Sequence, residues 1–140
     1  MVITFSVLGD PVPQPRHKIT ARGPFAHAYI PKSHAIHAYR KAIAEAAIDA
    51  GATPTDDAPL TLVLVLQFER PKSHFNKSGL KKTAPKLPRP DVSNCIKGIE
   101  DALNGIAWHD DQQVGTVVAT KRFGDEPMTV VEITSDESKP

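Results

Sequence analysis

Three aspartates flank one amphipathic segment and could together hold a divalent cation. Asp91 follows Arg89-Pro90 and directly precedes the segment, and Asp110 and Asp111 come shortly after it. Carboxylates suit Mg²⁺, which takes oxygen ligands, keeps several waters and binds through one or two carboxylates plus phosphate oxygens. An ion held in this way activates water and stabilises the charge that develops as a phosphodiester is hydrolysed.

Each of these charged residues also has a structural interpretation. Aspartate is a favoured N-cap whose carboxylate complements the helix dipole, so Asp91 could cap a helix. Asp110 and Asp111 could be turn residues before a strand. Lys97 could form an i,i+4 pair with Asp101, or it could contact a scissile phosphate or the leaving oxygen. Local sequence leaves both interpretations open for every one of them.

Bringing the aspartates together makes a demand on the fold. A helix of about 15 residues spans about 22 Å, so Asp91 and Asp111 cannot meet across the helix alone. They can meet if the chain from Ile106 doubles back, so that a strand over 113–123 begins near the start of the helix. The six residues from Ile106 to Asp111 reach about 20 Å when extended, which makes this path taut.

Charge is strongly segregated along the chain although the formal net charge is +1. Residues 11–90 carry 13 lysines and arginines against five acidic residues, whereas residues 91–140 carry four against ten. The densest part is residues 70–90, with seven basic residues, no acidic residue and four prolines. We expect a long loop here, and loops of this length inside compact domains are usually functional or disordered.

Periodicity and turn signals predict the elements that position these residues. A strand over 2–8 leads to a basic loop with a short hairpin around 19–30, and a helix capped by Ser33 runs to Ala50. The near-unbroken apolar run 60–69 predicts a central, buried strand. Asp91 begins a second helix, which Asn104-Gly105 ends. Strands over 113–123 and 128–134 and a polar tail over 135–140 follow.

The resulting order, β-α-β-loop-α-β-β, predicts one two-layer α/β domain over residues 1–140, with two main helices on a mixed sheet of about four strands. A lone cysteine excludes an internal disulfide and favours the reducing cytoplasm. The longest apolar run, 60–66, is far shorter than the roughly 20 residues that cross a bilayer, so we expect no membrane partner.

The segment RPDVSNCIKGIEDALNGIAWHDDQQV, residues 89–114, resembles the RusA family of Holliday-junction resolvases. The stretches VPQPRHKITARG, YIPKS and QFERPKSH are also similar to phage members, in the same order along the chain. The resemblance implies a homodimeric, Mg²⁺-dependent endonuclease of bacteria, prophages or phages, with Mn²⁺ expected to substitute. Its substrate would be branched double-stranded DNA, in which it makes paired nicks at four-way junctions during recombination and repair.

The resemblance also implies roles for single residues. Asp91 and Asp111 match the family's catalytic, metal-binding aspartates, Asp110 matches the neighbour of the second, and Lys97 matches the functional lysine. One position departs, because Ser93 stands where the family commonly has another aspartate, followed by the expected Asn94. Ser93 or Asn94 could bind the metal or orient a metal-bound water. The cations expected to contact DNA phosphates are Arg16, Lys18, Arg22, Lys72, Lys81, Lys82, Lys86 and Arg89.

Two further functions stay open. The neutral Ser93 favours, as an alternative, a catalytically weak or inactive protein that still binds DNA junctions. A small RNA-binding or ribosome-associated protein could also use the basic loop, although aromatic residues are only 6% of the chain and scattered. His74 and His109, which adjoin the basic loop and the aspartate pair, could supply a base or a metal ligand.

Overall fold

A four-stranded mixed sheet is the frame of the protein. The computed structural model describes residues 1–15, 18–20, 27–54 and 57–135. The strands are β1 (Val2–Leu8), β4 (Leu60–Phe68), β7 (Val114–Phe123) and β8 (Met128–Ser135), in the order β1-β8-β4-β7. β4 pairs parallel with β7 and antiparallel with β8, which also pairs antiparallel with β1.

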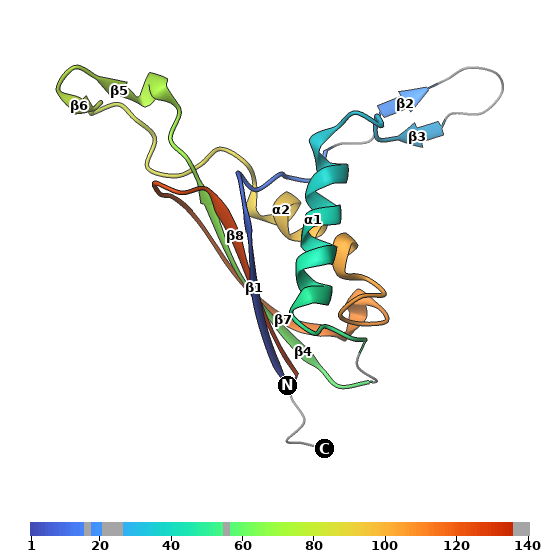
Figure 1. Ribbon diagram of the computed structural model, residues 1–140. Helices are drawn as coiled ribbons and strands as arrows, with labels where there is room; N and C mark the ends of the chain where they lie inside the picture. Colours follow the sequence, from blue (N-terminus) through green and yellow to red (C-terminus); the bar gives the residue numbers. More distant parts are fainter. Residues whose placement is uncertain (16–17, 21–26, 55–56, 136–140) are drawn as a thin grey trace.

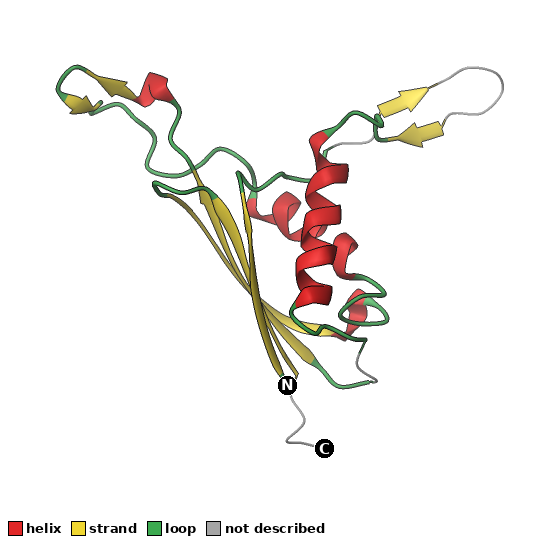
Figure 2. Cartoon of the chain, viewed as in Figure 1, coloured by secondary structure: helices red, strands yellow, loops and turns green. Residues whose placement is uncertain are grey.

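Two helices, α1 (Ala35–Asp49) and α2 (Val92–Leu103), cover one face of this sheet, as Figure 2 shows. The predicted two-layer α/β fold is therefore confirmed. β4 is central, as its apolar run predicts, and its alternate side chains from Leu60 to Phe68 are buried against the helices. Amphipathic helices cover the sheet because their apolar sides, including Ile36, Ile43 and Ile99, fill the space over it.

Two hairpins project beyond the same end of the sheet, opposite the end where the N-terminus lies (Figure 1). One is formed by β2 (Lys18–Thr20) and β3 (His27–Tyr29). The other lies within residues 70–90, here called the basic arm, and contains the 3₁₀ turn η1 (Lys72–His74), β5 (Phe75–Asn76) and β6 (Gly79–Leu80). The arm therefore has local structure that sequence periodicity did not predict.

Several element boundaries differ from expectation by one or two residues. Ser33 does not cap α1, because the helix begins at Ala35 and the His34 Nδ1 accepts the backbone N–H of Ile36 at 3.0 Å. The second helix begins at Val92, with Asp91 at the N-cap position. β8 includes Ser135, and the rest of the expected tail, 136–140, lies outside the described residues. Among the described residues, no helix is long and apolar enough to cross a membrane.

Candidate active site

Asp91 occupies the N-cap position of α2 without capping the helix through its side chain. Its backbone is extended and its carbonyl oxygen accepts the Cys95 N–H at 3.2 Å, but its carboxylate makes no cap hydrogen bond. Within the described part of the chain, this exposed carboxylate has neither a hydrogen-bond nor an ion-pair partner. The capping interpretation is therefore wrong for the side chain, which is accessible to a ligand.

Lys121, near the end of β7, lies beside the start of α2. Its Nζ donates to the Pro90 carbonyl oxygen at 3.1 Å, and its charge acts on the Cys95 thiol together with that of Asp91. Sequence analysis missed Lys121. The register Leu66↔Lys121 puts this cation in line with the buried, helix-facing residues of β4, and that register is visible only in the folded chain.

Lys97 forms the structural pair that its spacing allows. Its Nζ lies 3.6 Å from Oδ1 of Asp101, and the lysine side chain is 59% exposed. Such an exposed pair is worth about 0.3–0.5 kcal/mol, so it does not hold Lys97 firmly away from a phosphate. The other Asp101 oxygen accepts from Nη2 of Arg40 at 3.4 Å, and the same Nη2 donates to Oε1 of Gln14.

The proline-rich segment 11–15 is docked on α2 next to this network. The Gln14 N–H donates to the Asn94 carbonyl oxygen at 2.9 Å. Gly98 makes room for the contact, because a Cβ there would lie 3.2 Å from Cδ1 of Ile36 and 3.7 Å from the Val12 carbonyl oxygen. This segment leads directly into the β2–β3 hairpin, so the docking fixes the point on α2 from which the hairpin departs.

Asp110 is engaged by local structure at the far end of α2. It caps the short 3₁₀ turn η2 (Asp111–Gln113), accepting the Gln112 N–H at 3.0 Å, while Oε1 of Gln113 accepts the backbone N–H of Asp110 in return. The turn interpretation of Asp110 is therefore confirmed. Asp111, half-buried, approaches Glu100: burial first, then the nearby Asp111 charge, raises the pKa of the Glu100 carboxyl.

The structure does not bring Asp91 and Asp111 together through the expected path. β7 begins beside Leu60 and reaches the start of α2 only at Lys121, so Asp111 lies near the other end of α2 (Figure 1). The condition under which the two carboxylates could meet, a strand that begins near the helix N-terminus, is therefore not met. The cause is buried Trp108, whose Nε1 donates to Oδ1 of Asn104 at 2.6 Å and whose carbonyl oxygen accepts from Gly105, which closes a tight turn after the helix.

The side chains at the start of α2 are of the right chemical kind to bind a divalent cation, but few of them lie close together. Asp91 and the exposed Ser93 and Asn94 of the first turn of α2 offer oxygen ligands of the kind that Mg²⁺ prefers. Over the described ranges, no three His, Cys, Asp or Glu side chains lie close enough to share an ion. His109 is exposed beside Asp110, and His74 packs against Phe123 instead of facing a carboxylate.

The basic arm presents its cations to solvent next to Asp91. Lys72, Lys81, Lys82, Lys86 and Arg89 are all exposed, and none of them forms an ion pair within the described residues. Unpaired cations in such number attract a polyanion. Lys18 lies in β2, on the other hairpin, whereas Arg16 and Arg22 lie outside the described residues.

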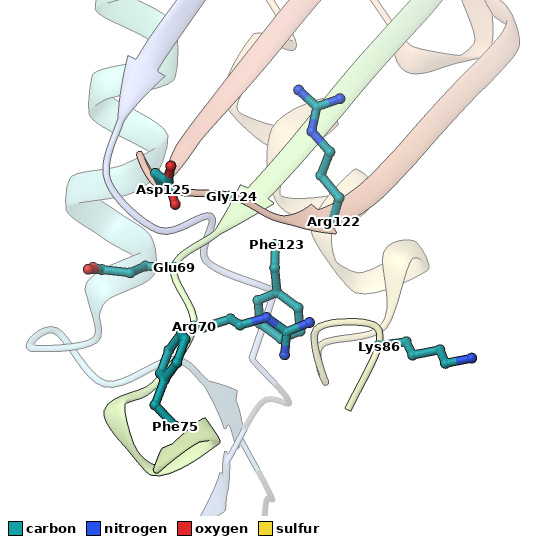
Figure 3. Close-up of a pocket in the computed structure, with 8 residues that line it drawn as sticks. All are labelled: Glu69, Arg70, Phe75, Lys86, Arg122, Phe123, Gly124 and Asp125. Atoms are coloured by element: carbon teal, nitrogen blue, oxygen red, sulfur yellow. The ribbon is translucent and has the colours of Figure 1, made fainter. Parts of the chain in front are cut away.

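Two cavities flank the base of the arm. One, of about 550 Å³, extends from Asp10 and His74 to Arg89 and Pro90, and thus to the residue before Asp91. The other, of about 470 Å³, is lined by residues of the arm and of the end of β7, as Figure 3 shows. Sequence analysis did not single out Phe75 or Phe123, because the pairing of the arm with the sheet end has no local signal.

The fold thus places an accessible carboxylate at the start of α2, directly after the exposed cations of the basic arm, a combination suited to binding a phosphate polyanion. The family described as Endodeoxyribonuclease RusA matches residues 9–134, nearly the whole chain, and this protein belongs to that family. The resemblance inferred from the sequence is confirmed. The chain is also 29% identical over 136 residues to the uncharacterized protein YqaN of Bacillus subtilis (strain 168), a match that covers 94% of each chain.

Family membership places the chain among endodeoxyribonucleases, and it supports Holliday-junction resolution on branched DNA. The matched residues include α2, the basic arm, Asp91 and the pair Asp110–Asp111.

Proposed function

We propose that this protein is a structure-selective endonuclease that resolves four-way DNA junctions by Mg²⁺-dependent hydrolysis of paired phosphodiesters. The observation that carries the proposal is the Asp91 carboxylate, exposed and unpartnered at the start of α2. It lies directly after a basic arm, in a chain that belongs to the RusA family. The biological context would be recombination and repair of DNA in the bacterial cytoplasm, with a phage or prophage gene as the source.

Asp91 is the proposed ligand for the ion, with Ser93 or Asn94 holding one of its waters. When bound, Mg²⁺ or Mn²⁺ would activate water and stabilise the charge that develops on the phosphate. Lys97 and Lys121 would place positive charge on either side of the same turn of α2, where it favours the transition state over the substrate.

Asp111 and Asp110 are kept as proposed ligands on the strength of the family match alone, since the structure places them near the end of α2 opposite to Asp91. Asp110 is the weaker candidate, because one of its oxygens already caps η2. Asp111 has no such bond and is the better candidate. We further propose that residues 1–140 form a single domain and that the active protein is a homodimer, which would present two sites to the two strands that must be cut.

Cleavage of a synthetic four-way junction is the direct test. We expect nicking in Mg²⁺ or Mn²⁺ and little cleavage of a linear duplex. Asp91→Asn and Asp111→Asn should each lower cleavage by about 100-fold or more, since an amide is a poor ligand for the ion. Junction binding should remain intact or tighten, because negative charge beside the DNA phosphates is removed. Near-wild-type nicking by either variant would show that its metal assignment is wrong.

Metal binding can be located without activity. Mn²⁺ broadens NMR signals of nearby nuclei, so we expect it to broaden the amides of Ser93 and Asn94 in the wild-type protein and not in Asp91→Asn. Broadening confined to the turn around Asp111 would place the ion at the other end of α2. That result would contradict Asp91 as the primary ligand while leaving the nuclease proposal to the cleavage assay.

A DNA-junction-binding protein that cuts weakly or not at all is the second candidate. Ser93 favours it, because this neutral hydroxyl removes one negative charge from a place where the family commonly has a carboxylate. If Ser93 faces the ion, Ser93→Asp should raise cleavage or metal affinity. Unchanged Mg²⁺ dependence with lower stability would show that residue 93 faces elsewhere, where its carboxylate would repel Asp91.

A further inference from the structure

Phe75, the aromatic residue of the basic arm, is exposed to solvent, and its exposure does not contribute to the packing of the fold. Phe75 is 47% exposed, whereas every other aromatic side chain whose burial the structure describes is buried or half-buried. Its cross-strand partner Leu80 is 51% exposed, and Leu87 in the returning strand of the arm is 56% exposed. The arm thus combines apolar surface with seven cations, and apolar surface contributes nothing to holding a phosphate.

Phe75 also forms one wall of a cavity. The space of about 470 Å³ lies within the size range of small-molecule sites, roughly 300–1,000 Å³. Figure 3 shows the Phe75 ring beside Arg70, whose guanidinium extends over the ring of Phe123. Arg122 and Lys86 add positive charge to the lining, which also includes the carboxylates of Glu69 and Asp125. An aromatic wall next to cations suits a ligand that has both a flat ring and a phosphate.

The arm holds Phe75 in place before any ligand arrives. The Arg70 guanidinium lies 4.2 Å from the centre of the Phe123 ring, and its Nη1 donates to the Pro85 carbonyl oxygen at 2.8 Å, so the two strands of the arm are joined at its base. The His74 ring meets the Phe123 ring edge-on, with centroids 5.7 Å apart. Ordering the segment that carries Phe75 in advance lowers the entropy lost on binding.

The distal turn of the arm is ordered in the same way. Both the N–H and the Oγ of Ser78 donate to Oδ1 of Asn76, at 3.0 and 2.9 Å, and the Lys81 N–H donates to the His74 carbonyl oxygen at 2.9 Å. Gly79 supplies the positive φ of 116° that this turn needs. The exposed ring therefore stands on a hydrogen-bonded hairpin.

We propose that the Phe75 ring and this cavity form a binding site for one unstacked nucleobase of a DNA strand. The proposal rests on the proposed function, in that the arm is taken to bind branched DNA. The cations of the arm contact the phosphates, and Phe75 stacks on a base that has left the duplex. Bases at a branch point are the least costly to unstack, so this site favours junctions over continuous duplex.

The charge of the arm decides between a nucleic acid and a protein as the occupant. The arm contains no acidic residue between positions 70 and 90. The exposed lysines of the arm have no ion-pair partner among the described residues. A second copy of the same arm would bring seven further positive charges against these. A polyanion with stacking bases matches both the charge and the exposed ring.

Binding of Phe75→Ala to DNA tests the proposal without any cleavage or added metal. The probes are a synthetic four-way junction and an oligo-dT single strand, with Val118→Ala, a truncation of another exposed apolar side chain, as the control. Loss of one base–aromatic stack should weaken binding of both probes by roughly 5- to 100-fold. The dependence of the affinity on salt should stay the same, because no phosphate contact is removed.

Fluorescence supplies the second readout. The chain has a single tryptophan, Trp108, which is buried, so Phe75→Trp adds one exposed emitter. We expect this variant to bind as tightly as the wild type and its emission to be quenched by oligo-dT, whereas the emission of Val118→Trp stays constant.

Three results would overturn the base site. Wild-type affinity of Phe75→Ala, or an unquenched tryptophan at position 75 in the bound complex, would show that no base stacks there. A changed oligomeric state of Phe75→Ala with unchanged DNA affinity would make Phe75 a contact between copies of the chain. If the wild-type protein bound neither probe, the proposed function would fail together with the site, and this outcome is distinct from the other two.

Discussion

The two ends of α2 carry carboxylates in opposite situations. At the start, the Asp91 side chain is exposed and its carboxylate makes no hydrogen bond to the helix that it precedes. At the end, Asp110 caps the turn η2, Trp108 is fully buried and bonded to Asn104, and burial together with the Asp111 charge raises the pKa of the Glu100 carboxyl. Local structure uses the polar groups at one end and leaves those at the other end available.

The difference indicates that the end of α2 contributes to the stability of the fold, whereas its start is available for binding a ligand. The end of α2 closes the chain into the parallel strand pair β4–β7, which needs a tight, satisfied turn. The start of α2 receives the chain from the basic arm, and its unpaired carboxylate lies next to unpaired cations. Such groups add little to folding, and a phosphate with a bridging cation would satisfy both.

The largest expected effect is on stability, at the end of α2. Trp108→Ala should lower the free energy of unfolding by about 3–5 kcal/mol, since it removes a fully buried ring and leaves Asn104 without its bond. Asp91→Asn should change it by no more than about 0.5 kcal/mol. Urea denaturation followed by circular dichroism measures both. A similar loss for the two variants would remove the contrast between the two ends.

The next effect is on DNA binding by the basic arm, which leads into the start of α2. Replacing Lys81 and Lys82 by alanine should weaken binding to junction and duplex alike, and should make the log–log salt dependence shallower by roughly one to two units. Stability should hardly move, because both side chains are exposed and unpaired within the described residues. Binding titrations at several salt concentrations measure the slope.

Lys41→Ala is the matched control for the arm lysines. Lys41 is an exposed lysine on α1, paired with Glu45 at 3.9 Å, and lies in neither hairpin. It should leave the salt dependence unchanged. If the arm variant also keeps the wild-type slope, the arm does not bind phosphates, and the β2–β3 hairpin with Lys18 becomes the better candidate.

A smaller effect separates the two neighbouring aspartates. Asp110→Ala removes the cap of η2 and should cost about 1 kcal/mol of stability. Nicking by the folded variant should remain well above that of Asp111→Asn, because the Asp110 carboxylate is already engaged. Equal loss of nicking in the two variants would mean that Asp110 binds the ion as well, and that its cap is not its main role.

Sequence reasoning predicted best what depends on pattern. The apolar run of β4 predicted a central strand, and the helical spacing of apolar residues predicted both helices, because burial acts on every residue of such an element. Boundaries set by one hydrogen bond were less predictable. His34 caps α1 instead of Ser33, since either side chain can accept at a helix start and only the backbone path decides.

The candidate site residues came from motif positions. Motif positions identified Asp91, Lys97 and Asp111, but not their distances, because the path from Asn104 to Asp111 depends on how Trp108 packs in the core. Lys121 was missed because its role follows from its place in the parallel register, 30 residues after Asp91. The spacing of residues within one segment does not predict which distant segment it pairs with.

The smallest expected effect is on Cys95, which reports on the charges at the start of α2. Burial, opposed by the Lys121 charge and reinforced by that of Asp91, raises the pKa of the Cys95 thiol to about 11. Alkylation by iodoacetamide should therefore be slow at neutral pH and rise with pH up to about 11, since the thiolate reacts. Asp91→Asn should react somewhat faster because the pKa falls, and Lys121→Met somewhat more slowly because it rises.

The raised pKa of Cys95 also predicts how the stability of the fold changes with pH. The folded state binds the thiol proton more tightly than the unfolded state, so this contribution to stability is complete below pH 9 and is lost as the pH rises towards 11. Cys95→Ala, which lacks the thiol, should lose less stability over that interval than the wild type. Equal alkylation rates in the wild type, Asp91→Asn and Lys121→Met would show that neither charge acts on Cys95. The contrast between the two ends of α2 would then not extend to the electrostatics of this thiol.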